Sequence, residues 1–415
     1  MTTALTPKRE LWLLLSLAGI QFTHIVDFMV MMPLGPQFTQ LFRISDAQFG
    51  LLVSAYTFAA GASGLLASLY IDRFGRKNLL LVLYVLFGLA TLACGLAPSY
   101  ESLMAARIAA GTFGGILSAL SQTIVADVIP FERRGRASAI VMSSFSAATV
   151  AGVPLSLFLA AHWGWHAPFI AIAIVCAALT AVAWGTLPPL REHLARAPAS
   201  PLANIMQVVS DPNHLKAFAF SALLMGAGFA VIPYITIYTT VNGGLTAQQI
   251  PYIYLCGGAA TLLTARWVGR MTDSLGKQAM FRATALATTV PMLLMTLSAP
   301  WGMAAILVVS TSFFICMSSR MIPGMAVLVS AGNPQLRGTF MALNSSVQSA
   351  AMGAAAYLGG LIISRDAQGF VQHYWGNALL GIVATLASLW MVGKLSLYGA
   401  APSKSKAAAA EAVAK

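Results

Sequence analysis

The sequence predicts an all-α integral membrane protein whose twelve transmembrane helices form two pseudo-symmetric six-helix bundles. Three observations predict this fold class. The 415 residues are 58% hydrophobic and only 9% charged, a composition that excludes an ordinary soluble domain. Apolar runs of about 20 residues, the length that spans a bilayer, recur along the whole chain. Finally, two charged loop motifs occur twice at a nearly constant separation.

The apolar runs define the predicted spans, each close to the length that a bilayer requires. In the first half they are residues 11–33, 48–71, 78–97, 102–127, 136–161 and 167–187. In the second half they are residues 214–240, 247–270, 279–298, 302–328, 337–363 and 374–396. Twelve spans place both ends of the chain on the same side of the membrane.

The basic residues indicate which side that is. Most of the 24 Lys and Arg residues fall in loops on the side of the chain termini, whereas the opposite loops hold Arg43 and Arg365. Because cytoplasmic loops are enriched in Lys and Arg, we expect both termini to be cytoplasmic. The net charge of +12 therefore indicates membrane topology, and we expect no nucleic-acid partner.

The internal repeat supports two bundles. Asp72 and Gly75 of the loop after the second span correspond to Asp273 and Gly276, at an offset of 201 residues, and Gly135 corresponds to Gly338 at 203. Duplicated six-helix units are typical of one large transporter class. We expect bundles at residues 1–187 and 214–397, a cytoplasmic linker with a short surface helix at 188–213, and a disordered tail at 398–415.

The loop after the second span carries a charged motif, with the sequence SLYIDRFGRK over residues 68–77. It resembles the Gly-x-Leu-x-Asp-Arg-x-Gly-Arg-Lys signature of the major facilitator superfamily, with Ser68 and Tyr70 in place of the first glycine and the leucine. A weaker copy, GRMTDSLGK, occupies residues 269–277. The resemblance extends in order over the whole chain and implies a transporter that works by rocker-switch alternating access.

Two helix motifs add to this resemblance. Arg107 and Gly111 match the superfamily's Arg-x-x-x-Gly element in the fourth span. Gly152 and Pro154 resemble the Gly-x-Pro motif of drug:proton antiporters, although Ser156 replaces a further glycine. The resemblance therefore implies the branch of drug and sugar exporters.

The loop motif favours a gating role. An acid at the end of one helix can pair with arginines of the next cytoplasmic loop, and such contacts form only when that side is closed. A glycine permits a tight turn there. The predicted gating residues are Asp72, Arg73, Gly75, Arg76, Lys77, Arg133, Arg134, Arg136, Asp273, Gly276 and Arg337. The alternative is that the basic residues only fix the loop in the cytoplasm.

Asp27 is the one acid placed well inside a predicted span. A charge at mid-bilayer costs about 2.5–3.5 kcal/mol on insertion scales, so an intramembrane acid is usually functional. Thr23, His24 and Asp27 share one helix face because three or four residues separate them. Asp27 and Arg107 both lie roughly 8–9 Å below the external surface at 1.5 Å per residue. The sequence therefore predicts an ion pair between them.

The functional hypothesis is that Asp27 binds the coupling proton and that His24 and Arg107 set its pKa. The alternative is a permanent bridge between Asp27 and Arg107 that only fixes packing. Arg320 either holds an anionic substrate group or a helix end, or its side chain extends to the membrane interface. Polar and flexible side chains at cavity positions are Gln21, Thr23, Met31, Gln122, Arg320, Asn344 and Gln348, although such residues can also join helices.

The sequence thus predicts a secondary transporter in a bacterial inner membrane that exports small amphipathic or drug-like molecules in exchange for protons. A sugar or metabolite exporter, an uptake symporter, and a receptor or passive pore on the same fold are alternatives. We expect a monomer that contacts its small-molecule substrate and the lipid bilayer. The sequence shows no phosphate-binding loop, metal-ligand cluster or nucleophile elbow, so we expect neither an enzyme nor a cofactor or metal.

Overall fold

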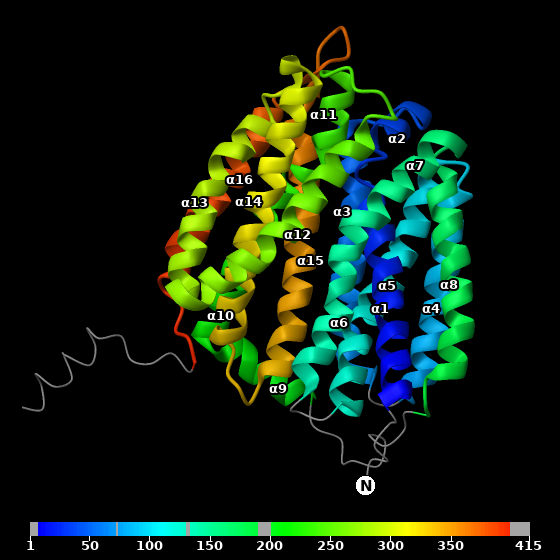
Figure 1. Cartoon of the computed structure of the whole chain (residues 1–415), viewed down its shortest axis with the longest axis vertical. Helices are drawn as coiled ribbons and strands as arrows, with labels where there is room; N and C mark the ends of the chain where they lie inside the picture. The colour runs from blue at the N-terminus through cyan, green and yellow to red at the C-terminus, as the bar shows by residue number, and fades with distance from the viewer. Residues whose placement is uncertain (1–6, 72–73, 130–132, 190–200, 399–415) are drawn as a thin grey trace, which may run out of the picture.

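A computed structural model describes residues 7–71, 74–129, 133–189 and 201–398. Within them, two six-helix bundles stand side by side (Figure 1). The first bundle contains α1 (Pro7–Val30), α2 (Gly35–Leu41), α3 (Asp46–Tyr70), α4 (Arg76–Gly95), α5 (Tyr100–Val128), α6 (Arg134–Ala147), η3 (Ala148–Gly152), α7 (Val153–Trp163) and α8 (His166–Thr186).

The second bundle follows α9 (Pro201–Ser210), a short helix inside the predicted linker. It contains α10 (Pro212–Phe229), η5 (Ile232–Tyr234), α11 (Ile235–Val241), α12 (Ile250–Leu275), α13 (Lys277–Met295), η6 (Ala299–Trp301), α14 (Gly302–Ala331), α15 (Arg337–Ile362), β1 (Ser364–Arg365), β2 (Val371–Gln372) and α16 (Tyr374–Val392). The two strands form an antiparallel hairpin in which Arg365 pairs with Val371.

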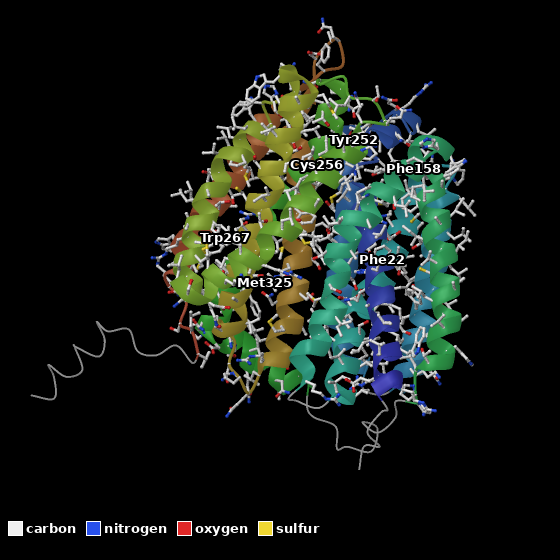
Figure 2. The ribbon with its side chains drawn as sticks, viewed as in Figure 1. Phe22, Phe158, Tyr252, Cys256, Trp267 and Met325 are labelled. Carbon is white, nitrogen blue, oxygen red and sulfur yellow. The ribbon has the colours of Figure 1, made fainter. Side chains whose placement is uncertain are left out.

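The helices correspond to the twelve predicted spans. In the described ranges, nine segments are long and apolar enough to cross a membrane. The other three, α12, α13 and α15, have transmembrane length but carry more polar residues. Large apolar side chains such as Phe158, Tyr252 and Trp267 are exposed on the outer surface (Figure 2), as expected of residues that face lipid.

The ends of several helices follow from their capping residues. Ser45 and Ser99 each begin a helix with a capping box, in which the serine hydroxyl accepts from a backbone N–H three residues later. This pairing satisfies donors that have no partner within the helix. The predicted first span ends at Pro33, and the predicted seventh span is interrupted near Pro233. At both places a long helix, α1 or α10, stops and a short helix follows.

The two breaks lie at the side of the bundles opposite the start of α1 and the end of α16, which we call the far side (Figure 1). There α2 packs against α11, and Gly35 touches Ile237 closely enough that a Cβ on the glycine would lie 3.0 Å from that side chain. Tyr374 and Asn377 donate to the carbonyls of Val231 and Ala230. The backbone groups released by the break in α10 are thereby satisfied within the membrane.

The halves also meet through α3 and α15. The Ser54 hydroxyl donates to the Gly353 carbonyl over 2.7 Å. Closer to the far side, Arg365 donates to both Asp46 carboxylate oxygens over 2.8 Å, and these hydrogen bonds raise the pKa of Arg365 above its usual value. Asp46 is only 5% exposed in this pair. A bidentate ion pair therefore joins the two halves on the far side.

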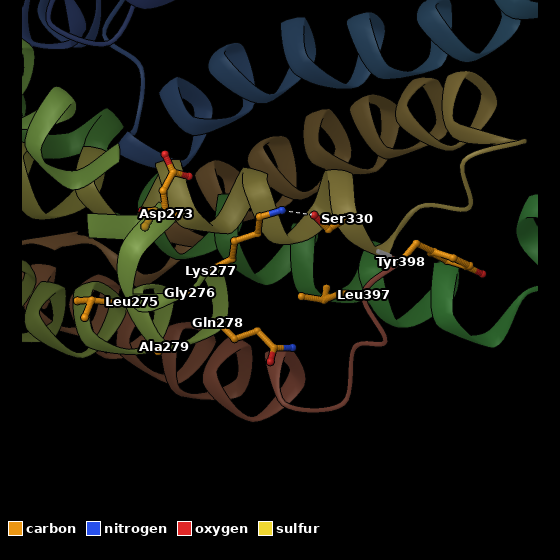
Figure 3. Close-up of a pocket in the computed structure, with 10 residues that line it drawn as sticks. Asp273, Leu275, Gly276, Lys277, Gln278, Ala279, Ser330, Leu397 and Tyr398 are labelled. Carbon is orange, nitrogen blue, oxygen red and sulfur yellow. Dashed lines mark hydrogen bonds between the residues drawn. The ribbon is translucent and has the colours of Figure 1, made fainter. Parts of the chain in front are cut away.

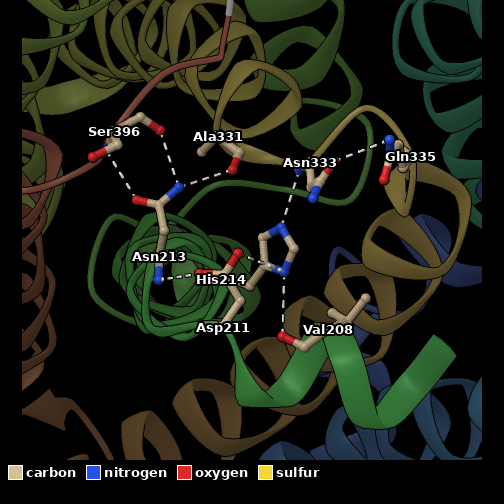
Figure 4. Close-up of polar contacts among 8 residues, drawn as sticks. All are labelled: Val208, Asp211, Asn213, His214, Ala331, Asn333, Gln335 and Ser396. Carbon is tan, nitrogen blue, oxygen red and sulfur yellow. Dashed lines mark hydrogen bonds and ion pairs between the residues drawn. The ribbon is translucent and has the colours of Figure 1, made fainter. Parts of the chain in front are cut away.

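On the terminal side, a hydrogen-bond cluster ties the linker helix to the second bundle (Figure 4). His214 is fully buried, accepts from the Asn333 backbone N–H at 3.0 Å, and lies 3.2 Å from the Val208 carbonyl. Asn213 bonds to Ala331 and Ser396. The end of α9, the start of α10 and the loop after α14 are therefore held together.

The backbone conformation requires glycine at one repeat position and not at its counterpart. Gly75, expected to permit a tight turn, has φ −62° and ψ 121°, a conformation that any residue adopts. Gly276 has φ +90° and ψ 143°, a region that is essentially restricted to glycine. The conformational argument made for Gly75 is therefore wrong, and it applies to Gly276 instead.

We expect Gly276→Ala to lower the free energy of unfolding by about 1–3 kcal/mol, the usual cost of a residue held in such a region. Gly338→Ala is the matched control, because Gly338 has no positive φ and a Cβ there meets nothing within 4 Å. Thermal unfolding of the two purified variants in detergent checks this. Equal melting temperatures for the two variants would contradict the assignment.

We expect Arg365→Gln to weaken closure of the far side, because hydrogen bonds to a charged group contribute about 1.5–3 kcal/mol. Spin labels at the exposed positions Gln40 and Gln248, in a background without native cysteines, report the separation by pulsed electron resonance. Loss of the Asp46–Arg365 ion pair should add a population in which the two spin labels lie farther apart.

The matched control for this experiment is Arg43→Gln. Arg43 is the other arginine that the sequence places in a far-side loop, and it is exposed. This substitution should leave the distances unchanged. The double variant Asp46→Arg, Arg365→Asp should restore the wild-type distribution. An unchanged distribution in Arg365→Gln would show that the ion pair does not hold the halves together.

Candidate functional site

A buried ion pair joins α1 to α5. The Arg107 Nη1 lies 3.0 Å from Asp27 Oδ2, and both side chains are 0% exposed. The same nitrogen donates to the Asp27 backbone carbonyl over 3.3 Å. The pair expected from the matching depths of the two residues is therefore formed, deep inside the first bundle.

The surroundings of the pair explain why α5 carries glycine at Gly111. A Cβ on this residue would lie 2.3 Å from the Tyr56 carbonyl, so glycine lets α3 approach α5 closely. The approach places the Tyr56 ring against Arg107, with the guanidinium carbon 4.2 Å from the ring centre. A cation at this distance is attracted by the negative face of the ring. The Arg-x-x-x-Gly element thus positions an arginine and the aromatic ring that contacts it.

His24 lies beside this pair. Its ring is 6.1 Å from the ring of Tyr56 and 5.9 Å from that of Phe87. The Nε2 atom is buried and has no hydrogen-bond partner among the described residues. His24 therefore adjoins the ion pair through Tyr56, and its role in setting the protonation of Asp27 stays a prediction.

The other predicted cavity residues of the first half bond within their own bundle. The Gln21 amide donates to Ser118 over 3.2 Å. Thr23 shares its helix face with Asp27, but its hydroxyl lies 2.9 Å from that of Tyr84 on α4. Gln122 donates to the sulfur of Met142. These three contacts join helices, as intramembrane polar residues commonly do.

The remaining cavity predictions have mixed environments. Met31 is fully buried in the core at the end of α1. Asn344 on α15 is 1% exposed, and its Oδ1 has no hydrogen-bond partner among the described residues. Gln348, one turn later, donates to the sulfur of Met325 over 3.7 Å. Asn344 is thus the one of these three with an unused buried acceptor.

Arg320 points into the second bundle. It is 1% exposed, and its guanidinium donates to the Thr385 hydroxyl over 2.9 Å and the Leu224 carbonyl over 3.1 Å. These partners belong to α16 and α10. The guanidinium is therefore held among three helices of one bundle, and its role toward an anionic substrate group stays a prediction.

The predicted gating loop is described in part. Lys77 donates to the carbonyls of Trp184 and Leu187. It thereby satisfies backbone carbonyls at the end of α8, where a cation is favourable.

The other predicted gating residues of the first half are described in part. Arg133 pairs with Glu10 at 3.1 Å, and Arg76 is buried. Asp72 and Arg73, like the side chains of Arg134 and Arg136, lie outside the described residues. The contacts of Lys77 and Arg133 stay within the first bundle.

The second copy of the loop motif borders a pocket of about 530 Å³ on the terminal side (Figure 3). Lys277 crosses it and donates to the Ser330 hydroxyl over 2.7 Å. Asp273 also lines this pocket and is exposed. Arg337, at the start of α15, is exposed too. At the repeat offset of 201 residues, Gln278 corresponds to Lys77. Gln278 donates to the carbonyls of Val392 and Leu395 at the end of α16. Lys77 does the same at the end of α8, so the repeat preserves this contact without preserving its charge.

The Gly-x-Pro motif lies where a π-helical turn, η3, leads into α7. Pro154 lacks the backbone N–H that a helix interior needs, and a π turn accommodates such a local change in hydrogen bonding. A Cβ on Gly152 would lie 2.3 Å from Val26. Gly152 therefore lets this irregular helix pack closely on α1, next to the residue that precedes Asp27.

Sequence reasoning missed Tyr56, Asp46 and the pairing of Arg365. An aromatic residue in an apolar span has no distinguishing spacing, so Tyr56 gave no usable signal. Arg365 did give one, because it is one of two basic residues predicted on the far side. Asp46, the acid just before the predicted span 48–71 on that same side, was the partner to expect.

A family model for the Major Facilitator Superfamily matches residues 17–356. The chain is 27% identical over 293 residues to a chloramphenicol resistance protein of Streptomyces lividans, covering 70% of this chain and 73% of that protein. It is 24% identical over 379 residues to a "Probable sugar efflux transporter" of Pasteurella multocida (strain Pm70), with 90% and 88% covered.

Solved structures share the fold. The crystal structure of a D-xylose-proton symporter has a TM-score of 0.75 and 18% identity, covering 91% of this chain and 96% of that one. A bacterial homologue of the human lysosomal transporter Spinster, in an inward-facing and occupied conformation, has a TM-score of 0.73 and 15% identity, covering 94% and 97%. The chain therefore belongs to the Major Facilitator Superfamily, and is a multi-pass membrane transporter rather than an enzyme.

Proposed function

We propose that this transporter exports small amphipathic or drug-like molecules in exchange for protons, with Asp27 as the proton-binding group. The fully buried Asp27–Arg107 pair carries the proposal. Such a carboxylate is tolerated in the membrane only with its partner, because an uncompensated buried charge costs several kcal/mol. Proton binding to Asp27 removes one charge of the pair and thereby changes the energy of the whole site.

The surroundings support a pair that opens during the cycle. Asp27 Oδ1 has no hydrogen-bond partner among the described residues, and neither has Arg107 Nε or Nη2. The two side chains are thus joined by one nitrogen–oxygen contact rather than by a bidentate pair, and a single contact is more easily broken than a bidentate one. The Tyr56 ring gives Arg107 a second, uncharged contact beside Asp27.

The proposed cycle is alternating access between the two bundles. The contacts of Asp46 with Arg365 and of Ser54 with Gly353 close the far side. In the proposed orientation, the termini are cytoplasmic in a bacterial inner membrane, so this arrangement would face inward. We propose that a monomer performs the cycle, because both halves of the pathway belong to one chain.

The relatives support export and leave the substrate class to experiment. One relative is named for chloramphenicol resistance, which favours amphipathic drugs. Another is named for sugar efflux and matches most of both chains, and a structural neighbour is a D-xylose-proton symporter. A sugar exporter or proton symporter is therefore the second candidate.

We expect Asp27→Asn to abolish uphill transport and keep counterflow. Asparagine has nearly the shape of the acid but binds no proton, so the carrier should still exchange labelled for unlabelled substrate without net proton movement. Proteoliposomes with an imposed pH gradient, an internal pH dye and a substrate check this. The matched control is Glu101→Gln, at an exposed acid at the far-side end of α5, which should behave as wild type. Undiminished proton-driven accumulation by Asp27→Asn would refute the proton role.

The two substrate candidates predict different directions of proton movement. In the same proteoliposomes, an exporter of the antiport type should move protons opposite to the substrate, whereas a symporter moves both together. Chloramphenicol and D-xylose are the first substrates to compare. We expect chloramphenicol to elicit counterflow and antiport, and a response to D-xylose alone would favour the second candidate.

A further inference from the structure

Arg107 makes only part of the contacts that a guanidinium can make. Its Nη1 contacts Asp27, whereas Nε and Nη2 have no hydrogen-bond partner among the described residues. The Tyr56 ring lies 4.2 Å from its central carbon. Movement of Arg107 away from Asp27 therefore changes its position relative to this ring.

The Tyr56 ring begins a row of stacked aromatic rings. Phe28 stacks on Tyr56 with ring centres 5.3 Å apart and an interplanar angle of 26°. Phe28 also stacks on Phe229, with ring centres 5.9 Å apart and an interplanar angle of 23°. Offset stacks at these separations are stabilising beyond the area they bury. Because Phe229 belongs to α10, the row crosses from the first bundle to the second.

The two phenylalanines occupy corresponding positions of the internal repeat. Phe28 and Phe229 are 201 residues apart, the same offset as Asp72 and Asp273. Each lies just before the point where its helix breaks on the far side, since α1 ends at Val30 and α10 ends at Phe229 itself. The two repeat-related breaks therefore meet through one aromatic pair.

The positions of these rings are closely fixed. A Cβ on Gly114 would lie 2.8 Å from the Tyr56 hydroxyl, and one on Gly111 even closer to the Tyr56 backbone. Phe28 directly follows Asp27 in α1. A change at the ion pair thus reaches the Phe28 ring by two routes, through the backbone of α1 and through the Arg107–Tyr56 contact.

We propose that the stack of Phe28 on Phe229 is the contact through which the protonation of Asp27 changes the balance between the far-side-closed and far-side-open states. The inference rests on the proposed proton role of Asp27. Tyr56, Phe28 and Phe229 are positioning residues, because they act through the ion pair and through the meeting of the two bundles. The Phe28–Phe229 stack spans the halves when the far side is closed, and separation of the bundles there breaks it. It therefore has the two states that coupling between distant groups requires.

The test measures the pH response of far-side closure. In the full-length protein with spin labels at Gln40 and Gln248, the ratio of open to closed populations is recorded across a pH series. Wild type should show a pH-dependent shift, and Asp27→Asn should show none. Phe229→Leu should reduce the shift by about two- to tenfold, the factor that corresponds to one aromatic pair. Phe28→Leu, which breaks the same stack from the other half, should have the same effect.

Two controls separate coupling from packing. Phe218→Leu breaks a stack of similar geometry, 5.1 Å and 14° to Phe340, in the same helix but within one bundle, and it should keep the wild-type pH response. Phe229→Tyr retains an aromatic ring and should restore most of the response. Phe28→Leu keeps the test valid if Phe229→Leu does not fold.

The outcomes distinguish the two proposals. If Asp27→Asn responds to pH as wild type does, the proton role itself is wrong. If Asp27→Asn loses the response while Phe229→Leu and Phe28→Leu keep it in full, the proton role stands and the coupling role of the stack is overturned. If Phe218→Leu loses the response as well, the effect is one of general packing, and the inference is likewise overturned.

Discussion

The pairing of Asp27 with Arg107 is the interaction on which the first bundle depends. Two charges with no exposed surface are tolerated inside a membrane protein only because each compensates the other. Their approach requires α1, α3 and α5 to lie close together, and Gly111 removes the side chain that would prevent it. The packing of three helices is therefore adapted to one ion pair.

The same packing connects the pair to the rest of the molecule. Gly152 lets the irregular segment around η3 approach α1 next to Asp27. On the other side, Tyr56, Phe28 and Phe229 extend from Arg107 to α10. The antiporter-like motif thus packs on the residue that precedes Asp27, and stacked rings connect the ion pair with the second bundle. Few rearrangements at such a site leave its neighbours unchanged, because packed interiors transmit displacement.

The second bundle stabilises its buried arginine, Arg320, in a different way. Arg320 has no carboxylate beside it among the contacts described, and it is held by a hydroxyl and a carbonyl oxygen. The halves therefore share a fold and a repeat without sharing chemistry in their interiors. This asymmetry is consistent with one proton-binding acid per transporter, located in the first half, while the second half contributes the broken helix α10 and the hairpin that carries Arg365.

The sequence by itself determined the class of membrane protein and the pairing of Asp27 with Arg107, and it predicted twelve spans and a duplication. Hydrophobic length and charge distribution carry that information, because the bilayer imposes them on every helix independently. It placed helix ends only approximately, since capping residues and prolines act over a few positions. It also assigned to Gly75 a turn that belongs to Gly276.

Only the tertiary structure decided which groups meet. Tyr56 and Phe229 lie in spans with no distinctive spacing, and they reach the ion pair only because helices far apart in the chain pack together. The sequence likewise did not predict the hydrogen-bond partners of Arg320 and Arg365, because a side chain's environment depends on the rotation of its helix and on the neighbouring helices. A period of 3.6 residues shows which residues share a face. The packing of the two bundles decides which residues that face contacts, and this information cannot be read from any single segment of the sequence.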